Sequence, residues 1–261
     1  TELEYLPPFV WEFDSKGEEL KITHVLSEEK ALQDVVGKTV EEIDGLSLQE
    51  FLVEQCSQIS ASTPHHKRSI AEIESLIGPR NSTLTLKLRN QDEINTVVCS
   101  RELTTMTFLH SLQGIRPTLA VLSDSSSVYI DLSKVRYSEF RKNIDQVSNA
   151  KKIIFDLRNY PTTDALKVLS HFIPQHNFKS PSWIQIPQII LPNMEQVSYL
   201  DKGWLPQGIS PFINQGDYYF LSSHSSISYT ETLLSFIKFL EIGTIIGEPS
   251  AGTNGNVKQV K

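Results

Sequence analysis

Cysteine is scarce in this sequence. Only Cys56 and Cys99 occur among 261 residues, so the fold does not require a disulfide framework. Their separation in the sequence does not show whether the two thiols pair, although a pair of buried or half-buried free thiols is the simplest interpretation. No spacing of Cys, His and Asp residues indicates a metal site, and no cofactor motif is present.

Long apolar runs and clusters of basic residues are also absent. Without a run of about 18 apolar residues, no segment is predicted to span a membrane. The formal net charge is -7 and basic residues are scattered, which argues against a nucleic-acid partner. The first residues lack the basic and apolar regions of a signal peptide, and a chain that begins at Thr1 without Met is expected to be a piece of a longer protein.

What the sequence does contain is typical of a globular protein. The chain is 39% hydrophobic and 21% charged, and its length predicts about two domains. The segment 104–118 shows no convincing periodicity and contains Gly114 and Pro117, so we place the domain boundary there. The predicted domains are residues 1–107 and residues 116–261.

The first half is predicted to be a small β-rich domain. From Lys21 onward the pattern predicts a strand, a short helical or loop segment, a turn at Gly37, a second strand, and a tight Asp44-Gly45 turn that leads into a helix. Further along, apolar and polar residues alternate in two segments around a turn, as in a hairpin with one solvated face; these segments are 83–89 and 94–101. Between the two halves of this domain, 69–77 is a candidate amphipathic helix.

The second half has the rhythm of a parallel sheet. The apolar strand candidates 127–132 and 151–157 are separated by a polar, helical segment, 133–149. A Pro-punctuated stretch, 174–216, carries Trp183 and Trp204 and is expected to cover the sheet or line a cleft. The remaining predicted elements are a helix at 163–173, a strand at 217–223, a helix at 229–241 and a strand at 243–248.

Three segments of the second half carry a family resemblance. They read IIFDLRNYP (153–161), YYFLSSHSSISYTETL (218–233) and GTIIGEPSAGTNGNV (243–257). In this order and spacing they resemble the C-terminal processing, or tail-specific, serine peptidases, and in particular the tricorn-like branch. The resemblance implies an α/β fold with a crotonase-like β-β-α protease core at 116–261, truncated at both ends relative to the whole protein.

The first half fits the same resemblance. The run from Gly37 to Gly45, GKTVEEIDG, is similar to the Gly-Asp-x-Ile-x-x-Ile-Asn-Gly pattern of the PDZ-like domain that these peptidases place ahead of their core. This implies that residues 1–107 form a PDZ-like peptide-binding domain with an N-terminal strand segment. The implied peptide groove includes Gly37, Val40 and Ile43.

Ser228 has two interpretations that do not exclude each other. Ser228 and Glu231 fit a capping box, in which the serine oxygen accepts a hydrogen bond from an early helix amide and the glutamate reaches back. The resemblance instead matches Ser228 to the catalytic nucleophile. A serine at a helix N-terminus suits that role, because the helix dipole and nearby amides stabilise developing negative charge.

The resemblance also implies an oxyanion hole. The backbone N–H of Tyr229 is one implied donor. The other is the N–H of Asn159, which stands where the family has glycine. Because glycine tolerates backbone conformations that strain asparagine, this departure bears on the geometry of the hole.

No catalytic base is matched within the chain. The lysine of the lysine-dyad branch falls on Thr253, which excludes that dyad. The tricorn-like branch draws its histidine and an acid from segments expected outside this chain. His224 is a weaker local candidate, and Ser226 is the closest rival to Ser228 as nucleophile, although it lacks the helix-start position.

Other polar residues have structural interpretations. Asp156 and Arg158 are interpreted as an ion pair that closes a strand–helix turn rather than as substrate contacts. The histidines at 65 and 66, in a predicted polar loop, and at 171, in a predicted helix, are interpreted as surface or interface residues.

The sequence therefore predicts a serine endopeptidase that cleaves polypeptides through an acyl-enzyme on Ser228. The alternative is a catalytically inactive relative that acts as a peptide-binding module; a crotonase-like acyl-CoA enzyme is disfavoured by the preceding PDZ-like domain. The expected partner is a polypeptide substrate, with no nucleic acid and no membrane span, and the oligomeric state is open. By resemblance, the expected location is exported, periplasmic or at the surface of a bacterium.

Overall fold

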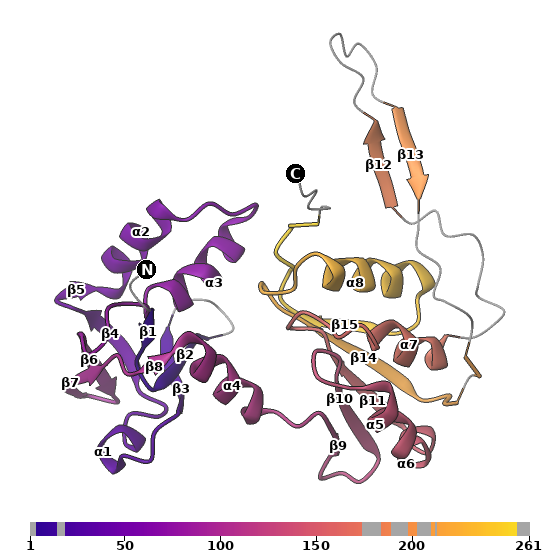
Figure 1. The fold of residues 1–261 in the computed structure, drawn as a ribbon, viewed down its shortest axis with the longest axis horizontal. Helices are drawn as coiled ribbons and strands as arrows, with labels where there is room; N and C mark the ends of the chain where they lie inside the picture. Colours follow the sequence, from indigo (N-terminus) through magenta and orange to yellow (C-terminus); the bar gives the residue numbers. More distant parts are fainter. Residues whose placement is uncertain are drawn as a thin grey trace. The chain divides into compact units, whose positions relative to one another are not determined.

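The computed structural model describes residues 4–14, 19–173, 184–188, 198–202, 210–211 and 213–254. The chain divides into two compact units, Thr1–Arg116 and Pro117–Lys261 (Figure 1). The first unit thus extends past residue 107, the end that the sequence suggested for the first domain. Each unit is described separately below.

The first unit is built on a six-stranded antiparallel sheet with the order β2-β3-β4-β6-β7, in which β5 also pairs with β4. The predicted hairpin is confirmed, because β6 and β7 pair in the antiparallel direction. Its alternation is also confirmed, since Leu84, Leu86 and Leu88 point inward and are fully buried. The strands of this sheet are β2 (Phe9–Phe13), β3 (Leu20–Val25), β4 (Thr39–Ile43), β5 (Leu46–Ser47), β6 (Thr83–Asn90) and β7 (Glu93–Ser100).

Four helices and a short strand pair complete this unit. The helices are α1 (Lys30–Gln33), α2 (Leu48–Gln58), α3 (Pro64–Glu74) and α4 (Thr105–Ile115), and β1 (Tyr5–Leu6) pairs with β8 (Leu103–Thr104). The predicted turns before α2 are confirmed, since Gly37, Asp44 and Gly45 all have positive φ.

Two helices of the first unit correct the sequence interpretation. Helix α3 begins at Pro64, capped by the Thr63 side chain, so His65 and His66 lie in its first turn and not in a loop. Helix α4 occupies the segment that the sequence predicts to be a domain boundary without periodicity. Its start is fixed by a cap, in which the Thr104 side chain accepts a hydrogen bond from the Thr107 N–H.

The second unit is built on a five-stranded sheet with the order β15-β14-β11-β10-β9. Strands β10, β11, β14 and β15 run parallel to one another, which confirms the predicted parallel arrangement, and β9 pairs with β10 in the antiparallel direction. The strands are β9 (Leu119–Val121), β10 (Ser127–Asp131), β11 (Lys152–Asp156), β14 (Asp217–Ser222) and β15 (Thr244–Gly247).

Helices pack their apolar faces on this sheet. They are α5 (Tyr137–Lys142), α6 (Ile144–Ser148), α7 (Ala165–Leu169), the 3-10 helix η1 (Ser170–Phe172) and α8 (Tyr229–Leu240). Helix α8, yellow in Figure 1, buries Leu233, Phe236 and Ile237 in the same cluster as Phe155 and Phe220 of the strands. The start of α8 is therefore held close to the ends of β11 and β14.

The proline-rich stretch contains a two-stranded antiparallel pair, β12 (Ile184–Gln188) and β13 (Ser198–Lys202). Trp183 and Trp204 lie outside the described residues.

Several composition-based expectations can be compared with the structure. Cys56 and Cys99 are free thiols, and burial raises the pKa of Cys99 to about 11. Within the described residues, no helix is both long and apolar enough to cross a membrane, and no group of three or more His, Cys, Asp or Glu side chains could hold a metal ion.

Candidate functional site

The three sequence segments with the family resemblance meet at one edge of the second sheet. Asp156 ends β11 and pairs with Leu221 near the end of β14, and Leu221 in turn pairs with Ile246 of β15. Because the carboxyl ends of parallel strands share an edge, the loops that follow these strands lie together. That edge is where ligand sites form in open α/β sheets, so the fold places all three segments at one candidate site.

Ser228 is the N-cap residue of α8, but it does not cap the helix. Its φ of 51° and ψ of -111° lie outside the regions that residues with a side chain favour. Its side chain makes no capping hydrogen bond, so the predicted capping box is wrong here. Instead the Ser228 N–H donates to the Thr253 carbonyl oxygen at 2.8 Å. A strained backbone that leaves a serine hydroxyl uncommitted at a strand-to-helix turn is typical of nucleophile turns.

Glu231 is diverted from the helix cap to the turn after β15. Its Oε1 accepts hydrogen bonds from the N–H of Gly252 at 2.7 Å and of Thr253 at 3.3 Å. The Glu231 residue is only 7% exposed, so these bonds act in a partly desolvated environment. Glu231 and Ser228 therefore hold the same turn from two sides. This contact could not be predicted from the sequence, because both donors are main-chain N–H groups.

The two implied oxyanion donors lie on segments that contact each other. Tyr229 is the first residue of α8, where the helix dipole favours negative charge. Asn159 follows β11, and its carbonyl oxygen accepts a hydrogen bond from the Thr230 hydroxyl at 3.4 Å. Asn159 is not among the residues with positive φ, so its backbone does not need the freedom of glycine. The departure from the family pattern at this position therefore brings no backbone strain.

Ser226 has a structural role. It is fully buried, and its Oγ donates to the Leu157 carbonyl oxygen at 2.8 Å and accepts from the Ser223 N–H at 3.1 Å. The Ser223 hydroxyl in turn donates to the Arg158 carbonyl oxygen at 3.1 Å. These bonds tie the loop before α8 to the end of β11, and they leave Ser226 poorly suited to act as a nucleophile.

Asp156 and Arg158 form the ion pair that the sequence suggested. Arg158 Nη2 lies 2.6 Å from Asp156 Oδ2, and the Tyr129 hydroxyl donates to the same oxygen at 2.5 Å. Burial acts to raise the pKa of Asp156, but hydrogen bonds from Arg158 and Tyr129 outweigh it and lower that pKa to about 2. The pair therefore stays ionised over the physiological range and fixes the turn that presents Asn159.

No base is joined to Ser228 within the described residues. No side chain there makes a hydrogen bond with the Ser228 hydroxyl. Thr253, at the position of the lysine in the lysine-dyad branch, contributes its main-chain carbonyl to the site. His224 is engaged with Glu248, with Nδ1 2.6 Å from Oε2.

His171 was expected at the surface, and this expectation is wrong. It is 1% exposed, and its ring lies between the Tyr137 hydroxyl and the Pro211 carbonyl oxygen, each 3.0 Å from a ring nitrogen. Burial lowers the pKa of His171. The Tyr137 ring stacks on it and the Phe140 ring packs against it at a tilt, so His171 is part of the packing of the second unit.

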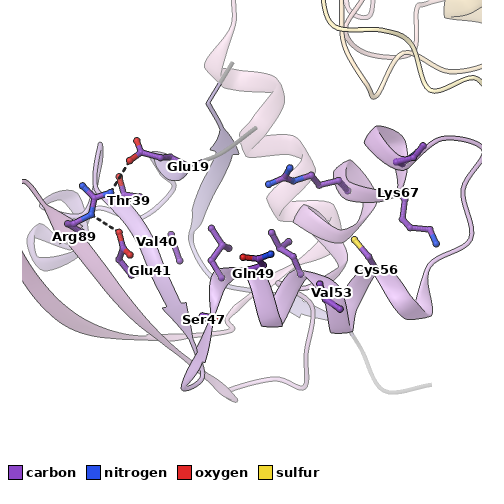
Figure 2. Close-up of a pocket in the computed structure, with 14 residues that line it drawn as sticks. Glu19, Thr39, Val40, Glu41, Ser47, Gln49, Val53, Cys56, Lys67 and Arg89 are labelled. Carbon is purple, nitrogen blue, oxygen red and sulfur yellow. Dashed lines mark hydrogen bonds and ion pairs between the residues drawn. The ribbon is translucent and has the colours of Figure 1, made fainter. Parts of the chain in front are cut away.

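A separate cavity of about 720 Å³ lies in the first unit, between β4, α2 and α3 (Figure 2). Of the three predicted groove residues, Val40 lines it. Gly37 is exposed and donates its N–H to the Ile22 carbonyl oxygen, and Ile43 is fully buried in the core.

The cavity has walls of different chemistry. On the sheet side, Arg89 makes ion pairs with Glu19 at 2.9 Å and with Glu41 at 2.6 Å (Figure 2). The helix side is apolar along α2 and cationic at α3, where Arg68 lies 3.7 Å above the centroid of the Phe13 ring. The helix-side residues are Leu48, Gln49, Leu52, Val53, Cys56, Pro64, Lys67 and Arg68.

No protein-family model and no curated protein matches the sequence. Solved structures do match over nearly the whole chain. A structure of mature CPAF complexed with lactacystin matches with a TM-score of 0.65 and 14% identity, covering 99% of this chain and 72% of that chain. A structure of mature CPAF alone matches with a TM-score of 0.61 and 14% identity, covering 99% of this chain and 71% of that chain.

A photosystem II D1 C-terminal processing protease also matches, with a TM-score of 0.37 and 12% identity, covering 97% of this chain and 62% of that chain. The chain shares the fold of CPAF, and identities this low concern the fold alone.

Proposed function

We propose that this protein is a serine endopeptidase of the C-terminal processing, tricorn-like type. The observation that carries the proposal is the geometry of Ser228: a strained residue at the start of α8, with no capping bond, at the carboxyl edge of a parallel sheet. The resemblance of the three segments and the fold shared with CPAF support the same reading. In this proposal the second unit is a crotonase-like protease core and the first unit a PDZ-like domain.

The proposed reaction follows from the groups at this edge. Ser228 Oγ attacks the carbonyl carbon of the scissile peptide bond and loses its proton to a general base, for which the tricorn-like resemblance implies a histidine. The N–H groups of Tyr229 and Asn159 stabilise the oxyanion. Collapse of the tetrahedral intermediate breaks the C–N bond, and the protonated base gives its proton to the leaving amine. Water then hydrolyses the ester on Ser228 by the same route and restores the serine.

The cavity of the first unit is the proposed binding site for a second part of the polypeptide. An extended peptide needs an apolar wall for its side chains and polar groups for its ends or charges. The α2 wall with Leu52 and Val53 supplies the first, and Lys67 and Arg68 of α3 supply the second. Val40 belongs to this site, whereas Gly37 and Ile43 shape the strand that borders it. An exported location remains a prediction from the resemblance.

A catalytically inactive, peptide-binding protein is the second candidate. One observation favours it: within the described residues, no base is hydrogen-bonded to the Ser228 hydroxyl. This protein would keep both units as a scaffold and bind polypeptide without cleaving it.

A fluorophosphonate probe on the full-length protein separates the two functions. We expect labelling of the wild type and a loss of at least about 10³-fold in the rate of peptide cleavage for Ser228→Ala. Ser235→Ala is the matched control, because Ser235 is an exposed serine on the same helix, and it should label normally. A folded wild type that neither labels nor cleaves, but binds peptide, would favour the inactive binder.

A further inference from the structure

Two tyrosines accompany the two proposed oxyanion donors. Tyr160 directly follows Asn159, and Tyr229 directly follows Ser228. Their ring centroids are 6.3 Å apart with an interplanar angle of 51°, although 69 positions separate them in the sequence. The turn after β11 and the start of α8 thus meet through aromatic side chains as well as through the bond between Thr230 and Asn159.

The two rings differ in exposure. The Tyr229 ring is partly buried and packs against the apolar cluster of the second unit. Tyr160 is 55% exposed, and it is not among the residues that pack against that cluster. Core packing therefore accounts for Tyr229 but not for Tyr160, whose ring is presented at the surface beside the candidate site.

The backbone that carries Tyr160 is fixed on both sides. Before it, Asn159 is bonded to Thr230. After it, Pro161 is buried and restricts the backbone of Tyr160 to extended conformations. Thr162 then donates its N–H to the Leu132 carbonyl oxygen at 2.8 Å and its hydroxyl to the Val135 carbonyl oxygen at 3.0 Å.

An exposed aromatic ring on an anchored backbone is suited to binding. Little conformational freedom remains to be lost when a ligand contacts it, and a tyrosine ring offers a large contact area with few rotatable bonds. The nearest cation in the sequence, Arg158, is held in its ion pair with Asp156.

We propose that Tyr160 and Tyr229 form an aromatic shelf beside Ser228 that binds an aromatic side chain of the polypeptide next to the scissile bond. This inference rests on the proposed peptidase function and adds its substrate class: polypeptides with an aromatic residue flanking the cleavage site. In this proposal the aromatic ring of the substrate packs at a tilt against the two tyrosine rings, an arrangement that aromatic rings favour over a parallel sandwich. Tyr160 thereby sets the preference for an aromatic residue beside the cleavage site. Tyr229 contributes its ring to the shelf and its main-chain N–H to the oxyanion hole.

The test measures how the full-length protein cleaves a series of peptides. The peptides differ only in the residues that flank the scissile bond, each of which is Phe, Ala or Asp. The wild type should cleave the Phe peptide with the highest kcat/KM. Tyr160→Ala should lower the ratio of kcat/KM for Phe over Ala by about three- to tenfold, the range expected for one aromatic contact. Tyr160→Phe keeps the ring and should keep the ratio.

Phe239→Ala is the matched control, since Phe239 is an exposed aromatic at the other end of α8 and should leave the ratio unchanged. The shelf is overturned if wild type shows no preference for Phe, or if Tyr160→Ala slows the Phe and Ala peptides equally.

A binding measurement keeps this inference separable from the peptidase proposal. Ser228→Ala protein is titrated with N-acetyl-phenylalanine amide and N-acetyl-alanine amide while the tyrosine resonances are followed by NMR. The shelf predicts shifts at Tyr160 and Tyr229 with the Phe compound only, and loss of its binding in the Ser228→Ala, Tyr160→Ala double variant. If wild type fails to cleave but this binding is present, the peptidase proposal fails and the shelf stands; equal or absent binding of both compounds rejects the shelf.

Discussion

Two helix starts in this protein carry the same Ser-x-x-Glu pattern and use it differently. Before α2, the Ser47 side chain accepts a hydrogen bond from the Glu50 N–H at 3.3 Å, and Glu50 Oε2 accepts from the Ser47 N–H at 3.1 Å. This is a complete capping box. Before α8, Ser228 and Glu231 form no such box, although their spacing is identical.

The difference lies in what each helix start can reach. The α2 start is exposed, and in the part of the chain that the structure describes, the Ser47 and Glu50 side chains bond only to each other and to each other's main-chain N–H. The α8 start lies against the turn after β15, which offers the Thr253 carbonyl to Ser228 and two amides to Glu231. At these two helix starts the pattern forms a cap where no tertiary partner competes, and at α8 the competition leaves the Ser228 side chain without a capping hydrogen bond.

The largest difference in stability between the two helix starts is expected when Glu231 and Glu50 are replaced. Glu231→Ala removes the acceptor for two amides of the turn, and we expect a loss of about 1–3 kcal/mol in the free energy of unfolding, because amides in a partly buried turn lose their acceptor. Glu50→Ala acts at an exposed helix end and should cost clearly less. Urea unfolding of both variants measures this, with Glu231→Gln as the control that keeps an acceptor oxygen. Equal losses for both alanine variants would remove the contrast.

Replacing Ser228 or Ser47 with glycine should change the free energy of unfolding in opposite directions. Ser228→Gly relieves the positive φ and breaks no capping bond, so we expect a gain of about 1 kcal/mol in unfolding free energy. Ser47→Gly removes a capping bond at a residue whose φ is -59°, so it should cost about 0.3 kcal/mol. Thermal unfolding followed by circular dichroism distinguishes the signs. A destabilised Ser228→Gly would show that the serine backbone is not strained.

The smallest effect is a pH dependence confined to the α2 cap. Hydrogen bonds from the Ser47 hydroxyl and N–H lower the pKa of Glu50. A carboxyl whose pKa is lower in the folded state stabilises the fold above its unfolded pKa, and this contribution is lost as the pH falls through the folded value. The stability difference between wild type and Glu50→Gln should therefore shrink as the pH falls below the usual glutamate range. If the stability difference between wild type and Glu50→Gln stays constant on acidification, the capping box is not the source of the pH dependence.

Much of the second unit could be predicted from the sequence. The strands β10, β11, β14 and β15 are short apolar runs that alternate with helical segments, and this rhythm specifies a parallel sheet. Because parallel strands end at one edge, the sheet brings the segments that carry Asn159 and Ser228 together. That these two residues share a catalytic site was implied by the family resemblance and stays a prediction. The paired Asp156 and Arg158 were likewise readable from their spacing.

The features that escaped prediction depend on contacts between distant residues. Helix α4 has weak periodicity, and its start rests on the Thr104 cap. His171 is buried because Tyr137 and the main chain at Pro211 enclose it, which its own neighbours in sequence do not reveal. The contact of Tyr160 with Tyr229 also joins residues from separate elements.

The sequence by itself determined where α8 begins, which residue types stand at its start, and which strand ends accompany it, because these follow from local periodicity and spacing. Only the tertiary structure decided what Ser228 and Glu231 do there. A hydrogen-bonding side chain takes the partner that the packed fold brings within reach, and at α8 that partner is the turn at Gly252 and Thr253 and not the helix itself.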